Sequence, residues 1–276
     1  MMQNEKDNKG SVDDYLKKLE AWFQAHPKTI TAFSGGVDSS IVLYLSKYFL
    51  GKDGIGCISA SASLKSKDLQ LAKRFCAEHD IYLEIVITQE MKDDDYMSNP
   101  TNRCYFCKNH LYLAINEVKS KFPGYEVLNG TNIDDLGDYR PGLEAAKEYD
   151  VRSPLVDCKV NKEGVRLLAR HFGLENWDKP ASPCLSSRIP YGTSVSIEKL
   201  MKIESAEELL NNYGFEDVRV RYMDGEASIE VEKDKIEKLN TIFPSIESEI
   251  LKIGFKKCSV DQEGLVSGKL NRVLNV

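Results

Sequence analysis

The sequence predicts an α/β protein, with a parallel sheet that carries helices on both faces and a smaller α+β domain behind it. In the first two thirds of the chain, short apolar runs alternate with segments of helical spacing, as in parallel strands joined by helices. After Pro190-Tyr191-Gly192 this alternation ends, and a helix, a hairpin and a second helix follow. We therefore expect one domain over residues 1–190 and a second over residues 191–276.

The first domain is expected to open with a helix, which Pro27-Lys28 ends. The expected helices span residues 13–25, 39–50, 67–79 and 105–122, and the expected strands span residues 29–33, 55–60, 82–86 and 125–128. Parallel α/β sheets bind ligands beyond the carboxyl ends of their strands. We therefore expect a site at that edge of the sheet.

The second domain is expected to start with a helix over residues 197–213. Its apolar residues recur on one face: Leu200, Ile203, Ala206, Leu209 and Leu210. Two strand-like runs flank Asp224-Gly225, which favours a hairpin over residues 218–231. A helix over residues 235–251, interrupted near Pro244, and a strand over residues 255–260 complete the domain.

The composition excludes several classes of protein. The 276 residues contain no apolar run near the roughly 20 residues of a membrane helix, and residues 1–14 lack the apolar core of a secretory signal. The net charge of −6 argues against a nucleic-acid partner, because such binders usually neutralise phosphates with a basic surface. We expect a cytoplasmic protein with no membrane or nucleic-acid partner.

A glycine-containing heptapeptide, Ser34-Gly35-Gly36-Val37-Asp38-Ser39-Ser40, joins the first strand to the next helix. Its glycines allow a tight turn with inward N–H groups, and the helix N-terminus and serine hydroxyls add to an anion-binding nest. No lysine follows the glycines, so this is not a Walker A motif, and a capped helix after a turn is the ordinary alternative. The heptapeptide resembles the SGGxDS signature of PP-loop ATP pyrophosphatases. The residues expected to bind ATP are Ala32, Phe33, Ser34, Gly35, Gly36, Asp38, Ser39, Ser40, Ala60 and Gly130.

The seven cysteines, an odd number, indicate free thiols, a metal site or a nucleophile rather than disulfides. Cys104 and Cys107 have the spacing that lets two thiolates bind one metal centre, and Cys184 is a third candidate. Three such ligands suit an iron–sulfur cluster or a zinc ion, with Cys158 as a candidate fourth. Inward packing of one helix face is the ordinary alternative for the pair. The other cysteines fall in strand or helix patterns typical of core residues: Cys57, Cys76 and Cys258.

Three arginines stand where an anion could bind. Arg140 is followed by Pro141-Gly142, which braces its loop. Arg219 and Arg221 alternate with apolar residues, so both project from one face of a strand and suit a phosphate or carboxylate. An edge strand kept soluble by its charge explains the second pair equally well.

Five motifs in order resemble the LarE family of ATP-dependent sulfur transferases, which act in the biosynthesis of the nickel-pincer nucleotide cofactor. They are the heptapeptide, Asp138-Tyr139-Arg140-Pro141-Gly142, Ser186-Ser187-Arg188-Ile189-Pro190-Tyr191-Gly192, Val218-Arg219-Val220-Arg221 and Ser267-Gly268-Lys269. The resemblance implies a PP-loop fold of the adenine nucleotide alpha hydrolase type, ATP with Mg²⁺, and pyridinium-3,5-biscarboxylic acid mononucleotide as substrate. It also implies a homo-oligomer, of hexameric type. The implied reaction adenylates a carboxylate and lets sulfur displace AMP, which gives a thiocarboxylate.

Members of this family obtain the sulfur in two ways. Some give up the sulfur of their own cysteine, which by alignment would fall at Pro183, and others bind an extra sulfide on a three-cysteine [4Fe-4S] cluster. This chain resembles the second kind, with Cys104, Cys107 and Cys184 as ligands and sulfide or another sulfur donor as co-substrate. The resemblance further assigns the substrate's phosphate or an intermediate to Arg188, Arg219 and Arg221, with Ser187 beside them and Lys269 as a further candidate. We expect Ser187 and Arg188 to be catalytic together with the three cysteines, and Arg140, on its braced loop, to bind the same anion.

Three other functions fit parts of this pattern. A tRNA thiolase uses the same loop and three cysteines but predicts a basic face, against the acidic total. An amide-forming synthetase that uses ammonia on an adenylate would have no use for the three cysteines. A non-enzymatic nucleotide-binding regulator would bind ATP without releasing pyrophosphate.

Overall fold

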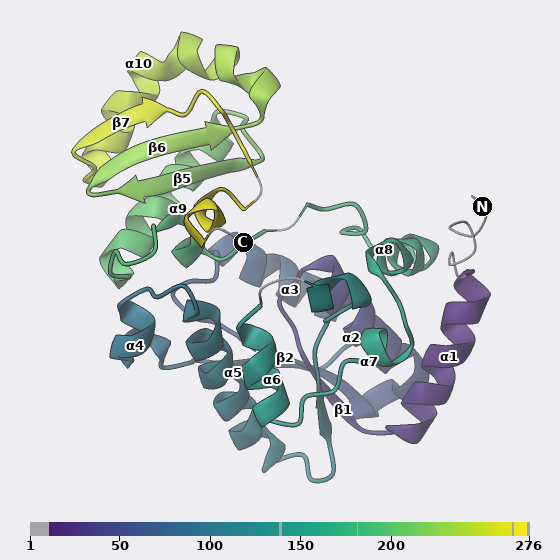
Figure 1. Cartoon of the computed structure of the whole chain (residues 1–276). Coiled ribbons are helices and arrows are strands. Elements are labelled where there is room, and N and C mark those ends of the chain that lie inside the picture. The colour runs from purple at the N-terminus through teal and green to yellow at the C-terminus, as the bar shows by residue number, and fades with distance from the viewer. Residues whose placement is uncertain (1–10, 138–139, 181, 267, 275–276) are drawn as a thin grey trace, which may run out of the picture. The chain divides into compact units, whose positions relative to one another are not determined.

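The computed structural model describes residues 11–137, 140–180, 182–266 and 268–274. Figure 1 shows the chain, which forms two compact units. The first unit contains residues 1–61, 66–88 and 104–182, and the second contains residues 62–65, 89–103 and 183–276. The residues predicted as a second domain, 191–276, are therefore part of a unit that also takes in two earlier segments.

The first unit is built on a four-stranded sheet of β1 (Thr29–Ala32), β2 (Gly54–Ser59), β3 (Leu83–Val86) and β4 (Glu126–Leu128). The strand order is β3-β2-β1-β4, and all three strand pairs are parallel. The four residues of β1 are all buried, as expected of a central strand that is covered on both faces. The predicted α/β class with a parallel sheet is confirmed.

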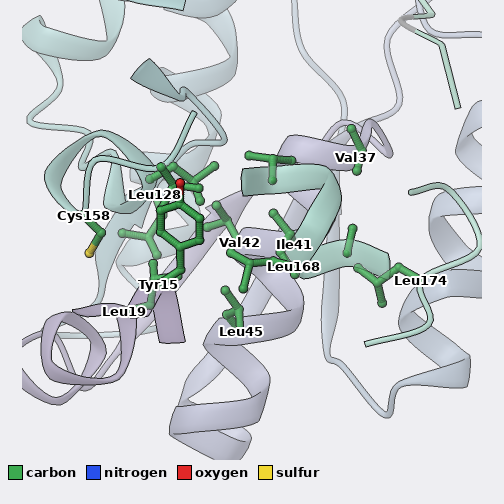
Figure 2. Close-up of a cluster of buried hydrophobic side chains, with 14 of the residues drawn as sticks. Tyr15, Leu19, Val37, Ile41, Val42, Leu45, Leu128, Cys158, Leu168 and Leu174 are labelled. Carbon is green, nitrogen blue, oxygen red and sulfur yellow. The ribbon is translucent and has the colours of Figure 1, made fainter. Parts of the chain in front are cut away.

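Helices pack on this sheet through two apolar clusters. In one, side chains of β1, β2 and β4 contact α5 (Arg103–Lys119) and α6 (Gly142–Glu148). In the other, α1 (Val12–Ala25), α2 (Val37–Leu50) and α8 (Lys162–His171) pack together, and Figure 2 shows Tyr15, Ile41 and Leu168 within it. The first unit also contains α3 (Ser66–Glu78) and α7 (Pro154–Asp157), whereas α4 (Asp94–Met97) belongs to the second unit.

The second unit contains a separate sheet. In it β5 (Val218–Met223) pairs with β6 (Glu226–Val231) as the predicted antiparallel hairpin, and β6 pairs in parallel with β7 (Lys257–Val260). Apolar residues of α9 (Ile197–Asn212) and α10 (Ile236–Ile253) share one buried cluster with these strands. Across both units, the described residues form 3-10 helices at Gly51–Asp53, Glu90–Lys92, Ile133–Gly137, Leu185–Arg188, Lys233–Lys235 and Lys269–Leu274.

The predicted interruption near Pro244 is wrong, because α10 runs without a break from Ile236 to Ile253. Proline removes one helical hydrogen bond and crowds the preceding turn, so local propensity favours a break. Buried residues on both sides of it, Leu239 and Ile246, belong to the same apolar cluster. Their burial in one core outweighs the local cost. Within the described residues, no helix has the length and apolarity to cross a membrane.

Candidate functional site

The first unit has a cavity where its strand order reverses. The chain runs from β1 outward to β3 and then places β4 on the other side of β1. Such a point leaves a crevice outside the carboxyl ends of the strands. A cavity of about 400 Å³ lies there, and its lining includes Ser34, Asp38, Asn129 and Gly130. The sequence-predicted ATP loop and the loop after the fourth strand thus meet at one cavity.

The loop after β1 presents backbone N–H groups at the start of α2. Gly35 has a φ of 77°, a left-handed conformation that favours glycine, and this turns the chain into the helix. Gly36 is the N-cap and provides no side chain to satisfy the first amides of α2. Unsatisfied amides and the positive end of the helix dipole favour an anion at this point.

The serine hydroxyls of the loop bond within the unit. Ser39 Oγ lies 3.0 Å from Ser34 Oγ and donates to the Gly36 carbonyl at 3.0 Å. Ser40 is fully buried, and its Oγ accepts a 2.8 Å hydrogen bond from the Asn176 amide, which also donates to the Gly35 carbonyl at 3.1 Å. These bonds hold the loop in shape, which leaves the backbone amides as the groups best placed to receive a ligand.

Gly130 explains how the two loops come together. A Cβ built on Gly130 would lie 2.6 Å from Ser39 N and 2.8 Å from Asp38 C, both backbone atoms of α2. Any side chain there would push the phosphate loop away from β4. The sequence analysis placed Gly130 among the residues expected to bind ATP, and in the structure its close neighbour is the backbone of the phosphate loop itself.

Two ion pairs lie on the loops around the cavity. Asp38 Oδ2 pairs with Lys162 Nζ at 2.5 Å, and Asp38 Oδ1 accepts a 3.0 Å hydrogen bond from the Asn132 amide. Asp135 pairs with Arg140 Nη2 at 2.6 Å. Burial raises the pKa of Asp135, while the Asn132 N–H bond and the Arg140 charge oppose the rise. Both carboxylates are therefore neutralised by a cation in this structure.

The cysteines fall into two groups by exposure. Cys104 is exposed, and Cys107 and Cys184 are half-buried. The other four are buried, and burial raises the pKa of Cys57, Cys76 and Cys258 to about 12 and that of Cys158 to about 11. Figure 2 shows Cys158 inside the apolar cluster around Tyr15 and Leu19. A buried thiol with a raised pKa is a poor metal ligand, since metals bind the thiolate.

Cys104 lines the same cavity as Ser34 and Asp38. Cys107 lies one turn further along α5, whereas Cys184 belongs to the second unit. Within neither unit do the described residues gather three or more His, Cys, Asp or Glu side chains into a metal-binding group. The exposed and half-buried thiols are nevertheless the chemically suitable donors for an iron–sulfur cluster.

In the second unit, Ser187 and Arg188 hold the backbone at Cys184. The Cys184 carbonyl accepts hydrogen bonds from Ser187 Oγ at 2.7 Å and from Arg188 Nη1 at 3.2 Å. Arg188 Nε and Nη2 also donate to the two Glu207 carboxylate oxygens, at 2.8 and 3.2 Å. Burial alone would raise the pKa of Glu207, but the Arg188 and Lys65 charges leave it below its usual value. Arg188, only 1% exposed, is thus placed to position Cys184.

The two arginines of β5 have different surroundings. Arg221 forms a buried two-bond pair with Glu230, at 3.0 and 2.9 Å, and donates to the Ser187 carbonyl at 2.7 Å. Arg219 reaches only a backbone acceptor, the Val266 carbonyl, at 3.4 Å, and no carboxylate of the described residues lies within ion-pair distance. Burial and the like charges of Arg188 and Arg221 lower the pKa of Arg219. Arg219 therefore retains the charge that an added anion could neutralise.

The remaining predicted residues are placed as follows. Lys269 pairs with Asp261 at 2.7 Å and lies 3.5 Å from Glu230 and 3.4 Å from Glu263. Burial alone would lower the pKa of Lys269, but these three carboxylates raise it above its usual value. Ala60 follows β2, and its N–H donates to the Val86 carbonyl. Ala32 and Phe33 are buried at the end of β1. The motif positions Asp138, Tyr139 and Ser267 lie outside the described residues.

Sequence reasoning missed several residues of these networks. The sequence could have indicated Glu207, because this charged residue falls on the apolar face of the predicted helix, beside Ile203 and Leu210. No feature of the sequence indicated Lys162, which lies 124 residues from Asp38 at the start of a helix without a recognisable motif. Asn132 lies two residues after Gly130, which was expected to bind ATP, but Asn132 itself was not among the expected site residues.

The chain resembles several known proteins over nearly its full length. It is 38% identical to an uncharacterised protein of Synechocystis sp. over 95% of this chain and 99% of that protein. It is 32% identical to the pyridinium-3,5-bisthiocarboxylic acid mononucleotide synthase of Lactiplantibacillus plantarum, over 90% of each chain. An uncharacterised protein of Methanocaldococcus jannaschii is 33% identical, over 86% of this chain and 90% of that protein. No protein-family model matches the chain. The motif resemblance to LarE is thus confirmed at the level of family, and the chain belongs to the pyridinium-3,5-bisthiocarboxylic acid mononucleotide synthase family.

Proposed function

We propose that this protein inserts sulfur into a pyridinium dicarboxylate mononucleotide, using ATP to activate a carboxylate as an acyl-adenylate. One observation carries the proposal: a single cavity is lined by the phosphate loop and by Cys104. The first suits the activation of a carboxylate and the second suits delivery of sulfur. The name of the Lactiplantibacillus relative supplies the substrate class.

The phosphate loop suits release of pyrophosphate. A carboxylate oxygen of the substrate attacks the α-phosphorus of ATP, and the bond to the β-phosphate oxygen breaks. Negative charge then develops on the departing pyrophosphate, where the amides of the first turn of α2, which receive no side-chain cap from Gly36, can stabilise it. Mg²⁺, bound with ATP, would neutralise part of the same charge.

The sulfur nucleophile then attacks the acyl carbon, and AMP leaves with the electron pair of the broken C–O bond. Cys104, Cys107 and Cys184 are the three thiols exposed or half-buried in the structure, so they would hold the [4Fe-4S] cluster. When bound, the cluster supplies an open iron for a sulfide that can be delivered. Ser187 and Arg188 fix the Cys184 backbone, so both serve as positioning residues in this scheme.

Arg219 is the group we assign to the substrate's phosphate. It is half-buried, its charge is not matched by a nearby carboxylate among the described residues, and a phosphate would relieve the repulsion from Arg188 and Arg221. Arg188 and Arg221 contribute by holding this positive region in place rather than by offering free hydrogen-bond donors.

Anaerobic turnover tests the proposal directly. Purified protein is incubated with ATP, Mg²⁺, sulfide and pyridinium-3,5-biscarboxylic acid mononucleotide, and pyrophosphate, AMP and thiocarboxylate are measured by mass spectrometry. We expect all three products in equal amounts, and about four irons per chain. The Cys104→Ala, Cys107→Ala, Cys184→Ala variant should lose the iron and the thiocarboxylate.

A Cys76→Ala variant is the matched control, because it removes a thiol buried away from this cavity and should keep its iron. Full thiocarboxylate yield from the triple variant would refute a role for these cysteines. Pyrophosphate release that depends on ammonia and yields an amide would identify the protein as an amide-forming synthetase instead.

A further inference from the structure

Lys162 brings a positive charge to a phosphate loop that has no lysine of its own. We propose that Lys162 is a phosphate-binding residue of the ATP site, and that its ammonium moves from Asp38 to the β- and γ-phosphate oxygens when ATP binds. The inference rests on the proposed use of ATP. It adds a residue that no motif of the sequence indicates.

The contacts that place Lys162 come from the loop after β4. Asn132, which is 1% exposed, donates to Asp38 Oδ1 at 3.0 Å, and its own Oδ1 accepts the Asp134 N–H at 3.0 Å. Asp134 Oδ2 in turn accepts the backbone N–H of Lys162 at 2.9 Å. The loop therefore ties the start of α8 to the start of α2. This holds the Lys162 ammonium beside the phosphate loop although its helix lies far along the chain.

The charge on Asp38 is the reason the loop needs this cation. Asp38 lines the cavity on the first turn of α2, so its carboxylate faces the region where the helix N-terminus attracts an anion. An unpaired carboxylate there would repel a polyphosphate. Lys162 Nζ, 2.5 Å from Asp38 Oδ2, offsets that repulsion in the ligand-free protein.

The same geometry allows Lys162 to change partners. Its side chain is 38% exposed and that of Asp38 is 26% exposed, so the pair is open to solvent and the long lysine side chain can rotate. An ammonium is a compact charge with three donors, which suits several oxygens of a phosphate group. When ATP arrives with Mg²⁺, Asp38 can face the metal while Lys162 contacts the phosphates.

Binding of ATP, pyrophosphate and AMP distinguishes a phosphate-binding role of Lys162 from a purely structural one. Calorimetric titration with ATP, pyrophosphate and AMP, each with Mg²⁺, is carried out on wild type, Lys162→Met and Lys162→Arg. We expect Lys162→Met to weaken ATP and pyrophosphate binding about 10- to 100-fold, the scale of a lost charged hydrogen bond. AMP lacks the phosphates that Lys162 contacts, so its affinity should change by less than about twofold. Lys162→Arg should recover much of the pyrophosphate affinity.

Lys47→Met is the matched control. Lys47 pairs with Asp80 at 2.9 Å in the same unit, and it lines a different cavity, whose lining contains no residue of the phosphate loop. This variant should bind all three ligands as wild type does. The Asp38→Asn, Lys162→Met double variant should remain weak for pyrophosphate, because removal of the repulsion does not restore the contact.

Three results would overturn the inference while leaving the proposed function intact. They are unchanged pyrophosphate affinity in Lys162→Met, an equal loss for AMP, and full recovery in the double variant. Wild type that binds neither ATP nor pyrophosphate would instead overturn the proposed use of ATP.

Discussion

The two units use charged and polar groups in opposite ways. In the first unit, the amides at the start of α2, the Cys104 thiol and the ion pairs of Asp38 and Asp135 lie on loops around a cavity. In the second unit, Arg188 and Arg221 are 1% and 6% exposed, and both are bound to buried glutamates. Similar charged motifs therefore form an open binding surface in one unit and an internal framework in the other.

This difference shows what a buried guanidinium can and cannot do. Arg188 already donates hydrogen bonds to Glu207, to Ser187 and to the backbone carbonyls of Pro183 and Cys184. A ligand would therefore have to displace these protein partners. A buried ion pair also tolerates the loss of one member poorly, because the other charge stays behind without compensation. The groups of the first unit are more exposed and can change partners at lower cost.

The largest expected effect is a loss of stability when the buried arginine–glutamate pairs of the second unit are broken. Arg188→Ala should lower the free energy of unfolding by about 3–5 kcal/mol, because it leaves the Glu207 carboxylate buried without its main partner. Arg140→Ala, which removes a side chain 47% exposed, should cost less than about 1 kcal/mol. Urea denaturation followed by circular dichroism measures both. Equal losses for the two variants would erase the contrast between the units.

Gly130→Ala should have the next largest effect. The added methyl group would lie 2.6 Å from Ser39 N, so the phosphate loop must shift, at a cost of about 1–3 kcal/mol. We expect weaker ATP binding together with the loss of stability, since the same backbone forms the anion site.

Gly137→Ala provides the control, because a Cβ at Gly137 meets no atom within 4 Å. Urea denaturation measures the stability of the two variants, and calorimetric titration measures their affinity for ATP. If Gly130→Ala binds ATP as wild type does, the close packing of the two loops does not shape the anion site.

Buried thiols provide a smaller, pH-dependent test. Burial raises the pKa of Cys57 from 9.0 to about 12, so above pH 9 the unfolded chain ionises this thiol while the folded chain does not. The stability that this thiol contributes is present below pH 9 and is lost as the pH rises toward 12. Between pH 9 and 10.5, unfolding free energy should fall more steeply in wild type than in Cys57→Ala, by a difference that approaches about 1.4 kcal/mol per pH unit above pH 10. Cys76→Ala, which removes a second buried thiol, should reproduce the change, and parallel slopes would contradict it.

Most elements that bury a regular face were predictable, although α8, which buries Val165, Leu168 and Ala169, was not among the expected helices. The alternation of strands and helices gave the parallel sheet, and most element ends were within two residues of those observed. The helix around Pro244 was not predicted correctly, because its continuity depends on residues such as Leu239 and Ile246 that meet a common core. Local sequence contains the cost of the proline but not the tertiary packing that offsets it.

The candidate site was predictable only where one segment contains the chemistry. The phosphate loop and the Cys104–Cys107 pair are such segments, and both lie where backbone and side chains reach solvent or a cavity. The sequence did not show which arginine pairs with Glu230. In the hairpin register Glu230 stands opposite Arg219, yet its carboxylate binds the diagonal neighbour Arg221, within reach of a long side chain. Sequence spacing predicts the shared strand face but does not say which arginine stays available.

Arg219 should therefore give the smallest stability effect and a clear functional one. Arg219→Ala removes a half-buried cation that is repelled by Arg188 and Arg221, so the free energy of unfolding should change by no more than about 0.5 kcal/mol. The substrate concentration for half-maximal thiocarboxylate formation should rise about tenfold or more, because a phosphate loses a charged partner. The substrate analogue without its phosphate should show no such rise. A loss of stability as large as that of Arg188→Ala would place Arg219 in the framework, and the phosphate would then need another partner.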